Sequence, residues 1–472
     1  MVVVVGPVHT NKCALDAYEA VGLKIAVSDS IQIYEILVMQ QAETIIIGAG
    51  PTGLSAAYHL EGSKVVLEST NRVGGLCRSF KMKDVVFDIG GHSFHTQHDE
   101  IRSLICKELG VNLFFQKRVA EILFKGSKVP YPWQRFFHLV EDRKVVEDCH
   151  AGLQRREHRS EPMNLQDLIL AKYGDGIAQH FLFPYNKKLW LRDLHEISCA
   201  WTSERIAGLA DESTIGERRT AQRKPLDENS MVGYPAKGGF GEIFKNMAAR
   251  VGKIEFDQHV CFIDPQMKVL MTRRGNVVKW ERIVSTIAIP DLIGMLKSAP
   301  SDIMRLAREL PYVSLQVDYF VTSEPLDGAP QRLYCADAEM PAHKIAFNSL
   351  SSENERKKPY HSIIAETSVD DLRKGCCRDR TDRILRGLCD AGLIKGQSRI
   401  LAHRYELVKY AYPVQSHRVA FIMEVLSHYL ECQGIYSAGR FGNWEYVNSD
   451  ECILGGAELA GRLDSSVRKI QN

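Results

Sequence analysis

The chain lacks an excess of charge of either sign, since 60 Lys and Arg residues face 58 Asp and Glu residues and leave a formal net charge of +2. Proteins that bind nucleic acid or membrane surfaces usually carry a basic excess, so neither partner is expected. No apolar run approaches the roughly 20 residues that a membrane-spanning helix needs. The 12 cysteines are scattered without a C-x-x-C pair, which predicts reduced thiols in a cytoplasmic protein and no disulfide framework.

What the chain does have is a glycine-rich stretch at residues 45–58, where an apolar run, a turn and the start of a helix follow one another. The turn contains Gly48, Gly50 and Gly53, and a second apolar run ends at Glu68. This is the G-x-G-x-x-G fingerprint in a βαβ setting. Gly48 allows the tight turn, Gly50 lets the backbone approach a pyrophosphate, and Gly53 lets helix and strand pack closely. The helix N-terminus attracts phosphates and Glu68 would accept hydrogen bonds from a ribose, so the stretch predicts a dinucleotide site.

Further glycines and charges favour FAD as the dinucleotide. A glycine pair at 74–75 is followed by Arg78, and a second pair at 90–91 follows a strand and precedes His92. Near the C-terminus an apolar strand ends at Gly439, and a helix that begins at glycines is expected after Asp450. These segments together resemble the FAD-binding amine oxidase superfamily, which implies FAD as the cofactor. The predicted cofactor-binding residues are Gly48, Gly50, Gly53, Glu68, Gly74, Gly75, Arg78, Gly90, Gly91, Gly439, Arg440 and Asp450.

A chain of this length needs more than one core. The simplest architecture is α/β, with a Rossmann-like FAD-binding domain interrupted by a helical insertion and a mixed-sheet substrate domain. The predicted parts are an N-terminal extension of unknown role (1–41), the FAD-binding domain (42–110, 235–300 and 431–472), a mainly helical substrate or cap region (111–234), and the substrate-domain sheet and helices (301–430).

Residues 129–134 read Val-Pro-Tyr-Pro-Trp-Gln, and residues 439–446 read Gly-Arg-Phe-Gly-Asn-Trp-Glu-Tyr. These segments resemble the V-P-Y-P-F-Q and G-R-F-G-x-W-x-Y motifs of UDP-galactopyranose mutase in its eukaryotic form, and within the superfamily the resemblance runs from about residue 43 to 460. Shorter matches occur in the family's order and at approximately its spacing. They comprise residues 184–186, 188–190 and 201–206, Asn229 ahead of Pro235, Tyr334 ahead of Lys344, and residues 411–413.

This resemblance implies a mutase that interconverts the pyranose and furanose forms of a nucleotide sugar such as UDP-galactose, through a bond between the sugar and N5 of reduced FAD. NADPH or NADH is the expected reductant, the nucleotide sugar is the expected small-molecule partner, and a homo-oligomer is left open. Breaking the sugar C1–O bond places negative charge on the diphosphate, which cations and hydroxyl donors stabilise. The catalytic residues so implied are His92, Arg205 and Lys344. The substrate-binding residues so implied are Tyr131, Trp133, Gln134, Asn186, Trp190, Asn229, Tyr334, Tyr412 and Tyr446.

Two departures from the mutase pattern keep other functions open. Lys344 stands where the family has a second diphosphate arginine, and lysine lacks the planar fork that binds phosphate bidentately. The loop after Tyr446 is also shorter than in the family. The alternatives are an amine oxidase-like, FAD-dependent oxidoreductase acting on an unknown small molecule, and a non-catalytic FAD-binding protein.

The three-residue spacing of His92, His95 and His98 would align them on a helix and invites a metal interpretation. The preceding strand and the paired glycines favour a loop instead, and no carboxylate or Cys with zinc spacing accompanies them. The sequence therefore predicts no metal site.

Overall fold

The computed structural model describes residues 40–156, 162–199, 201, 209, 230–370, 372 and 377–471, and the backbone of three earlier strands. Those strands, β1 (Val2–Val5), β2 (Ala26–Ser28) and β3 (Ile31–Glu35), form an antiparallel sheet within the predicted N-terminal extension.

The first large sheet gathers strands from three distant parts of the chain, as expected for an interrupted cofactor domain. Its order is β12 (Ile254–Glu255), β5 (Lys64–Leu67), β4 (Gln40–Ile47), β15 (Val277–Ser285), β14 (Val269–Thr272) and β13 (Val260–Asp264), with β21 (Ile435–Ser437) paired to β15. The strands β12, β5, β4, β15 and β21 run parallel. A parallel sheet is covered on both faces, which is why β4 ends in the unbroken apolar run that the sequence displays.

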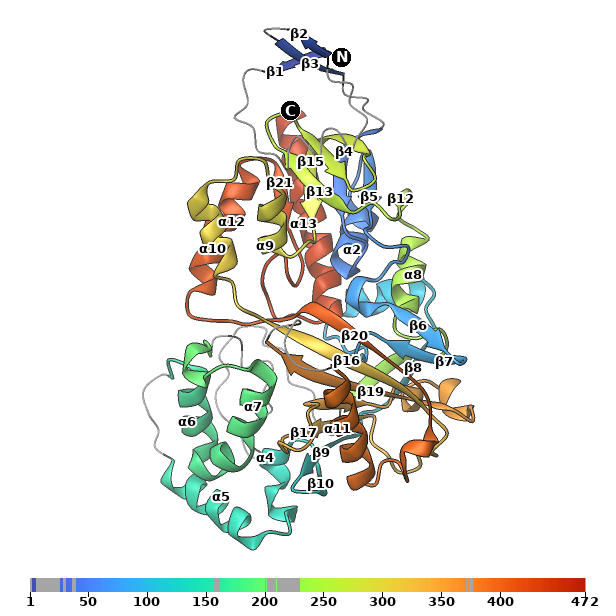
Figure 1. The fold of residues 1–472 in the computed structure, drawn as a ribbon, viewed down its shortest axis with the longest axis vertical. Coiled ribbons are helices and arrows are strands. Elements are labelled where there is room, and N and C mark those ends of the chain that lie inside the picture. The colour runs from blue at the N-terminus through green and yellow to red at the C-terminus, as the bar shows by residue number, and fades with distance from the viewer. Residues whose placement is uncertain are drawn as a thin grey trace.

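Helices cover both faces of this sheet (Figure 1). On one face lie α2 (Pro51–His59), α3 (Asp99–Ser103), α8 (Glu242–Ala248) and α13 (Ser449–Gln471), and on the other α9 (Ile289–Met295), α10 (Ser301–Arg308) and α12 (Val419–Glu431). The helix α13 begins at Ser449, ahead of the glycines where the sequence had placed its start. Gly456 instead serves packing, because a Cβ there would lie 2.5 Å from the carbonyl oxygen of Thr52 in α2.

The second large sheet is mixed and crosses the middle of the molecule (Figure 1). Its order is β10 (Ser127–Pro130), β9 (Ala120–Phe124), β17 (Arg332–Cys335), β18 (Lys344–Ala346), β19 (His361–Val369), β16 (Tyr312–Thr322) and β20 (Ile400–Pro413). Two short pairs accompany it, β6 (Ser79–Met82) with β7 (Val85–Asp88) and β8 (Leu113–Lys117) with β11 (Met231–Pro235).

The expectation that residues 111–234 are mainly helical needs correction at their start. The strands β8, β9 and β10 come first, and β9 joins the substrate sheet by pairing in parallel with β17. Helices follow, namely α4 (Trp133–Phe136), α5 (Arg143–Arg155), α6 (Leu165–Ile177) and α7 (Phe183–Trp190). The helix α11 (Cys377–Asp390) packs apolar residues against the second sheet. The fold class predicted from the sequence is therefore confirmed. No helix in the described part of the chain is both long enough and apolar enough to cross a membrane.

Candidate active site

The glycine turn after β4 has the geometry that only glycine permits. Gly48 has φ +104°, and a Cβ there would lie 2.2 Å from Oγ1 of Thr286 at the end of β15. A Cβ on Gly53 would lie 2.0 Å from the carbonyl oxygen of Gly48. By contrast, a Cβ on Gly50 would meet only Gly75 Cα, at 3.9 Å, so space is left beside this backbone. The turn thus seats α2 directly on the sheet and keeps its N-terminus open.

Glu68 and the second glycine loop are tied to this turn. One carboxylate oxygen of Glu68 accepts a hydrogen bond from the amide of Ala49 at 2.9 Å, and the other accepts from the amide of Thr70 at 2.8 Å. The amide of Gly74 donates to the carbonyl of Ala49 at 2.7 Å. Glu68 is buried but still lines the cavity described next, so its carboxylate is held in one place toward it.

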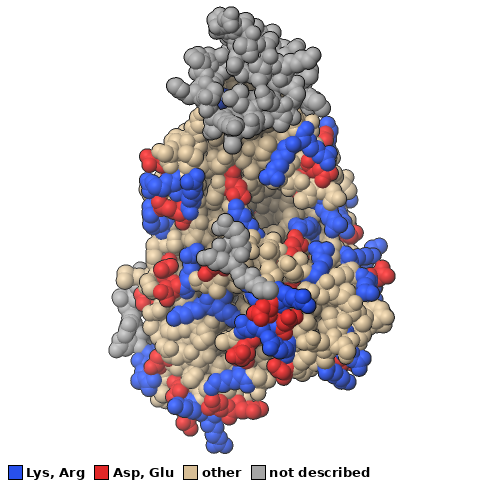
Figure 2. Space-filling model, in the orientation of Figure 1, with Lys and Arg blue, Asp and Glu red and all other residues tan. Residues whose placement is uncertain are grey.

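A single cavity of about 560 Å³ brings most of the predicted cofactor residues together. Its volume lies within the roughly 300–1,000 Å³ of ligand pockets. Among the predicted residues it is lined by Gly48, Gly50, Glu68, Gly75, Arg78, Gly91, His92, Tyr334, Lys344, Gly439, Arg440 and Asp450. The space-filling view is hollowed at the height of α2 and α13, with Lys and Arg side chains near the rim (Figure 2).

The charge of the cavity wall suits anions. Among described residues, six cationic side chains line it (Arg72, Arg78, Arg118, Arg332, Lys344, Arg440) against the two anionic ones of Glu68 and Asp450. Two helix N-termini, those of α2 and α13, reach the cavity through Thr52 and Ser449. Two of these cations, Arg78 and Lys344, also pair with the carboxylates of Glu406 and Glu366, which do not line the cavity, so the remaining positive charge suits one diphosphate.

Two buried nitrogen atoms at the cavity wall are free to form a hydrogen bond with a ligand. Among the residues that the structure describes, His92 Nδ1 and Arg440 Nε have no hydrogen-bond partner, although both residues line the cavity. Buried polar atoms are otherwise almost always paired. A polar ring system such as a flavin, lying between these residues, would satisfy them, and the diphosphate of FAD matches the glycine turn. The residues present therefore fit FAD.

The cavity wall also holds a cluster that we call the distal cations, namely Arg118 between β8 and β9, Arg332 on β17 and Lys344 on β18. Arg332 and Tyr334 lie two residues apart on β17, on one face, and Lys344 of β18 is the cross-strand partner of Tyr334. Arg118 donates a hydrogen bond to the Tyr334 hydroxyl at 2.8 Å. Burial would raise the pKa of Tyr334, but Arg118, Lys344 and Arg332 outweigh it and lower the pKa below its ordinary value.

Glu366 on β19 lies behind the distal cations and was not predicted. Its Oε1 contacts Lys344 Nζ at 2.8 Å and accepts a hydrogen bond from the amide of Gly91 at 2.8 Å. Its Oε2 accepts a hydrogen bond from the Tyr412 hydroxyl at 3.0 Å. Burial alone would raise the pKa of this carboxyl, yet attraction to Lys344 and His343, together with the hydrogen bonds from Lys344 and the Gly91 amide, lowers the pKa to about 2. Glu366 is therefore ionised at any working pH.

His92 lies at the cavity wall as a neutral imidazole. Its ring stacks on Phe240, with centroids 5.0 Å apart and planes at 12°. Burial, followed by the nearby charge of Lys344, lowers the pKa of His92 to about 3. Its carbonyl oxygen accepts a hydrogen bond from Arg332. The predicted place of His92, beside a bound flavin, is compatible with this position.

The predicted aromatic contacts divide into two groups. Trp190, Tyr412 and Tyr446 pack edge to face, and the guanidinium of Arg440 lies 4.9 Å from the Tyr446 ring centroid. Tyr131 lies under Arg118, 4.5 Å from its guanidinium carbon. These side chains form a layer behind the cationic wall and do not line the cavity themselves.

Trp133, Gln134 and Asn186, which the resemblance assigns to substrate binding, are buried and do not line the cavity. Trp133 is fully buried and stacks on Phe181 at 5.1 Å, because the short helix α4 turns its indole into the core. The side-chain amide of Asn186 donates a hydrogen bond to the backbone carbonyl of Leu182, one helical turn earlier, at 2.8 Å. Gln134 is buried with them. The predicted residues Arg205 and Asn229 lie outside the described residues.

Sequence reasoning missed Arg118, Arg332 and Glu366. Arg332 precedes Tyr334 by two residues, so alternation along the strand places both side chains on one face. Glu366 is the one acidic residue of β19. Both signals could have been read from the sequence. Arg118 follows β8 and belongs to no motif. Its place depends on pairing between β9 and β17, which are far apart in the sequence.

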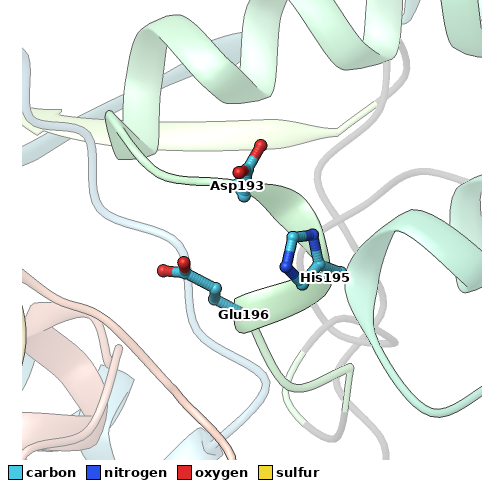
Figure 3. Close-up of side chains that lie close together, drawn as sticks. All are labelled: Asp193, His195 and Glu196. Carbon is cyan, nitrogen blue, oxygen red and sulfur yellow. The ribbon is translucent and has the colours of Figure 1, made fainter.

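One further group of potential metal ligands occurs among the described residues. Asp193, His195 and Glu196 lie on and beside one short turn, with ligand atoms within 4.8 Å of one another (Figure 3). All three side chains are exposed, and exposed acidic groups of this kind are common without an ion. His92, His95 and His98, whose spacing invited a metal interpretation, are not among the groups of this kind in the described part of the chain.

The fold is shared with solved flavoproteins. A structure of reduced UDP-galactopyranose mutase superposes with a TM-score of 0.81 at 23% identity, over 90% of this chain and 96% of that one. A putative protoporphyrinogen oxidase from Exiguobacterium sp. 255-15 gives a TM-score of 0.69 at 15% identity, over 91% of this chain and 99% of that one. At these identities the likeness establishes the fold alone.

Curated relatives match over shorter stretches. A probable flavin-containing monoamine oxidase A of Dictyostelium discoideum is 40% identical over 96 residues, 19% of this chain and 20% of that protein. The L-amino acid oxidase Cdc18 of Crotalus durissus cumanensis is 43% identical over 105 residues, 19% of this chain and 21% of that protein. The matched part thus spans about a fifth of the length of these relatives.

A family model covers far more of the chain. The model of flavin containing amine oxidoreductases matches residues 51–462, which include α2, both large sheets in large part, and the start of α13 at the cavity. Membership implies FAD, in agreement with the cavity's glycine turn, its cationic wall and its two unpaired nitrogens. The chain belongs to the flavin containing amine oxidoreductase family.

Proposed function

We propose that this protein is an FAD-dependent mutase that interconverts the pyranose and furanose forms of a nucleotide sugar, of which UDP-galactose is the model. The observation that carries the proposal is the continuation of the cofactor cavity into the distal cations. Arg118, Arg332 and Lys344, with Tyr334, line the same cavity as the glycine turn, and Arg118 donates a hydrogen bond to the Tyr334 hydroxyl. A second phosphorylated ligand would use them.

The chemistry needs a site that stabilises a leaving diphosphate. Negative charge develops on the diphosphate as the sugar C1–O bond breaks, and cations fixed in advance stabilise that charge more than they stabilise the ground state. The distal cations are held by protein partners: Arg118 by Tyr334, Arg332 by the carbonyl of His92, and Lys344 by Glu366. Bound reduced FAD would supply the nucleophilic ring nitrogen, and the chain's residues would orient the sugar toward it. The likeness of fold to a mutase supports this assignment.

The decisive experiment uses photochemically reduced holoenzyme without oxygen. Incubation with UDP-galactofuranose should yield UDP-galactopyranose, resolved by anion-exchange chromatography, with no net consumption of reductant. The oxidised enzyme should be inactive. Absence of interconversion would reject the galactose version, and failure to bind any UDP-sugar would reject the class. Addition of NADPH or NADH in place of light tests the proposed reductant.

A second candidate is an oxidoreductase, favoured by the matched relatives, which are named as amine and amino acid oxidases. The cationic wall would then bind a substrate carboxylate, and the neutral His92 would be available near the oxidised carbon. Steady oxygen uptake with an amine or an L-amino acid, accompanied by hydrogen peroxide, would support this activity. A mutase turns over without it.

A further inference from the structure

Three backbone positions, Gly90, Gly91 and His92, form a short segment at the cavity that we call the histidine loop. It lies directly against the second sheet, with no room for side chains between. A Cβ on Gly91 would lie 2.6 Å from Cβ of Ala346, and one on Gly90 would lie 2.9 Å from Oε1 of Glu366. The position of the loop is therefore set by the groups it contacts on the sheet.

Two side chains of that sheet bond to the loop backbone. Glu366 Oε1 accepts a hydrogen bond from the amide of Gly91 at 2.8 Å, and Arg332 donates to the carbonyl of His92. Both residues are buried. The loop is held from the substrate side of the cavity, although its imidazole lies where the flavin is expected.

The same carboxylate oxygen has a second partner. Glu366 Oε1 also lies 2.8 Å from Lys344 Nζ, and Lys344 lines the cavity. Its side chain retains 18% exposure, whereas that of Glu366 retains 3%. The ammonium can therefore meet an incoming anion, while the carboxylate cannot. One oxygen is shared between a ligand-accessible cation and the amide of the histidine loop.

We infer that Glu366 is a positioning residue that couples anion binding at Lys344 to the position of the histidine loop beside the flavin. An anion near Lys344 competes with Glu366 for the ammonium, and the shared oxygen then bonds the Gly91 amide more strongly. The loop moves toward β19 and takes the His92 imidazole with it. The inference rests on the proposed function in one respect only, namely that the second ligand is anionic.

The consequence is that the flavin environment reports occupancy of the diphosphate site. A nucleotide sugar that binds Lys344 would fix the position of the His92 imidazole before the reaction begins. Binding of an anion at Lys344 would also affect Tyr412, because the Tyr412 hydroxyl donates a hydrogen bond to the other carboxylate oxygen of Glu366.

The test titrates the holoenzyme with inorganic pyrophosphate and, separately, with UDP. Affinity comes from calorimetry, and the change in flavin absorbance reports the loop. In the wild type, pyrophosphate should perturb the flavin spectrum. In Glu366→Gln the carboxylate no longer competes for Lys344, so pyrophosphate should bind about fivefold to tenfold tighter. The spectral change at saturation should fall below about half of the wild-type amplitude, since the two events are uncoupled.

The matched control is Asp318→Asn, which alters a buried carboxylate in the same sheet. Asp318 bonds Thr381 and His403 and does not line the cavity. It should leave both pyrophosphate affinity and spectral amplitude at wild-type values. If Glu366→Gln behaves like this control, the coupling is refuted.

A double variant keeps the test available if Glu366→Gln does not fold. Lys344→Met with Glu366→Gln removes the buried ion pair as a unit, and pyrophosphate should then leave the flavin spectrum unchanged; a full-amplitude change would overturn the inference. If pyrophosphate causes no change in the flavin spectrum of the wild type, the inference is also overturned. If pyrophosphate acts as expected but UDP binds no more tightly than pyrophosphate, the coupling stands and the proposed nucleotide-sugar function fails.

Discussion

Replacing Lys344 by Met should destabilise the holoprotein and reverse the pH dependence contributed by Glu366. The wild-type pair joins a carboxylate with 3% side-chain exposure to an ammonium at 2.8 Å. The pKa of Glu366 falls from an ordinary 4.5 to about 2, a shift worth about 3 kcal/mol of folding free energy. Removing one partner of a buried pair costs about 3–5 kcal/mol, in agreement with that figure. The melting temperature should fall by roughly 3–5 °C, because the unfolding entropy of a chain of 472 residues is about 1 kcal/mol/K.

The sign of the pH effect separates this reasoning from a general loss of packing. In the wild type the folded pKa lies below the unfolded one, so the stabilisation is complete above about pH 4.5 and is lost as the pH falls toward 2. Without Lys344, burial raises the pKa of Glu366 above 4.5, because the charged form has lost its main partner. Stability of the variant should then decrease as the pH rises from 4.5 toward the new pKa.

The assay is urea unfolding of the holoprotein at pH 5, 6, 7 and 8, followed by fluorescence. Lys409→Met is the matched control, because Lys409 pairs with Asp291 at 2.9 Å with side chains 49% and 40% exposed. Exposed pairs contribute about 0–1 kcal/mol. Equal losses in the two variants, or stability of Lys344→Met that rises with pH over this range, would refute the argument.

Three other outcomes are expected. Gly53→Val should abolish FAD retention, measured as the flavin-to-protein ratio, because its Cβ would lie 2.0 Å from the Gly48 carbonyl; Gly455→Ala, with nothing within 4 Å of the added Cβ, should load fully. Trp133→Ala should cost about 3–5 kcal/mol in unfolding free energy, as for other buried aromatics, and a variant that loses only UDP affinity would restore its predicted substrate role. His92 should show no protonation between pH 5 and 8 by ¹⁵N NMR of labelled holoprotein, since its pKa is about 3; a titration in that window would contradict the buried, neutral imidazole.

The cofactor cradle was predictable because its chemistry is local. Gly48, Gly53 and Glu68 lie within one βαβ unit, and steric exclusion at each glycine follows from backbone geometry alone. The interrupted domain was also predictable, since apolar strands recur after long insertions. These features depend on short-range pattern and on the known handedness of such units.

The distal site was harder to predict, because it depends on register between strands. Arg332 meets His92, and Glu366 meets Gly91, only because β17, β18 and β19 pair as they do. Trp133 shows the opposite error: a matched motif gave the residue type, but the turn of α4 decided that the indole faces the core. A motif identifies a side chain, whereas the surrounding sheet and helices decide what it contacts.

The cofactor domain also has a consequence for the order of events during synthesis. Its sheet is completed by β21, and its cavity by the N-terminus of α13, which emerge from the ribosome after both insertions. Ser55 in α2 donates a hydrogen bond to Ile453, 398 residues later. The strands β4 and β5 therefore lack their later partners in the sheet while both insertions are translated. Contacts of such long range form slowly, so the nascent protein acquires its capacity for flavin only after β21 and the start of α13 have been translated.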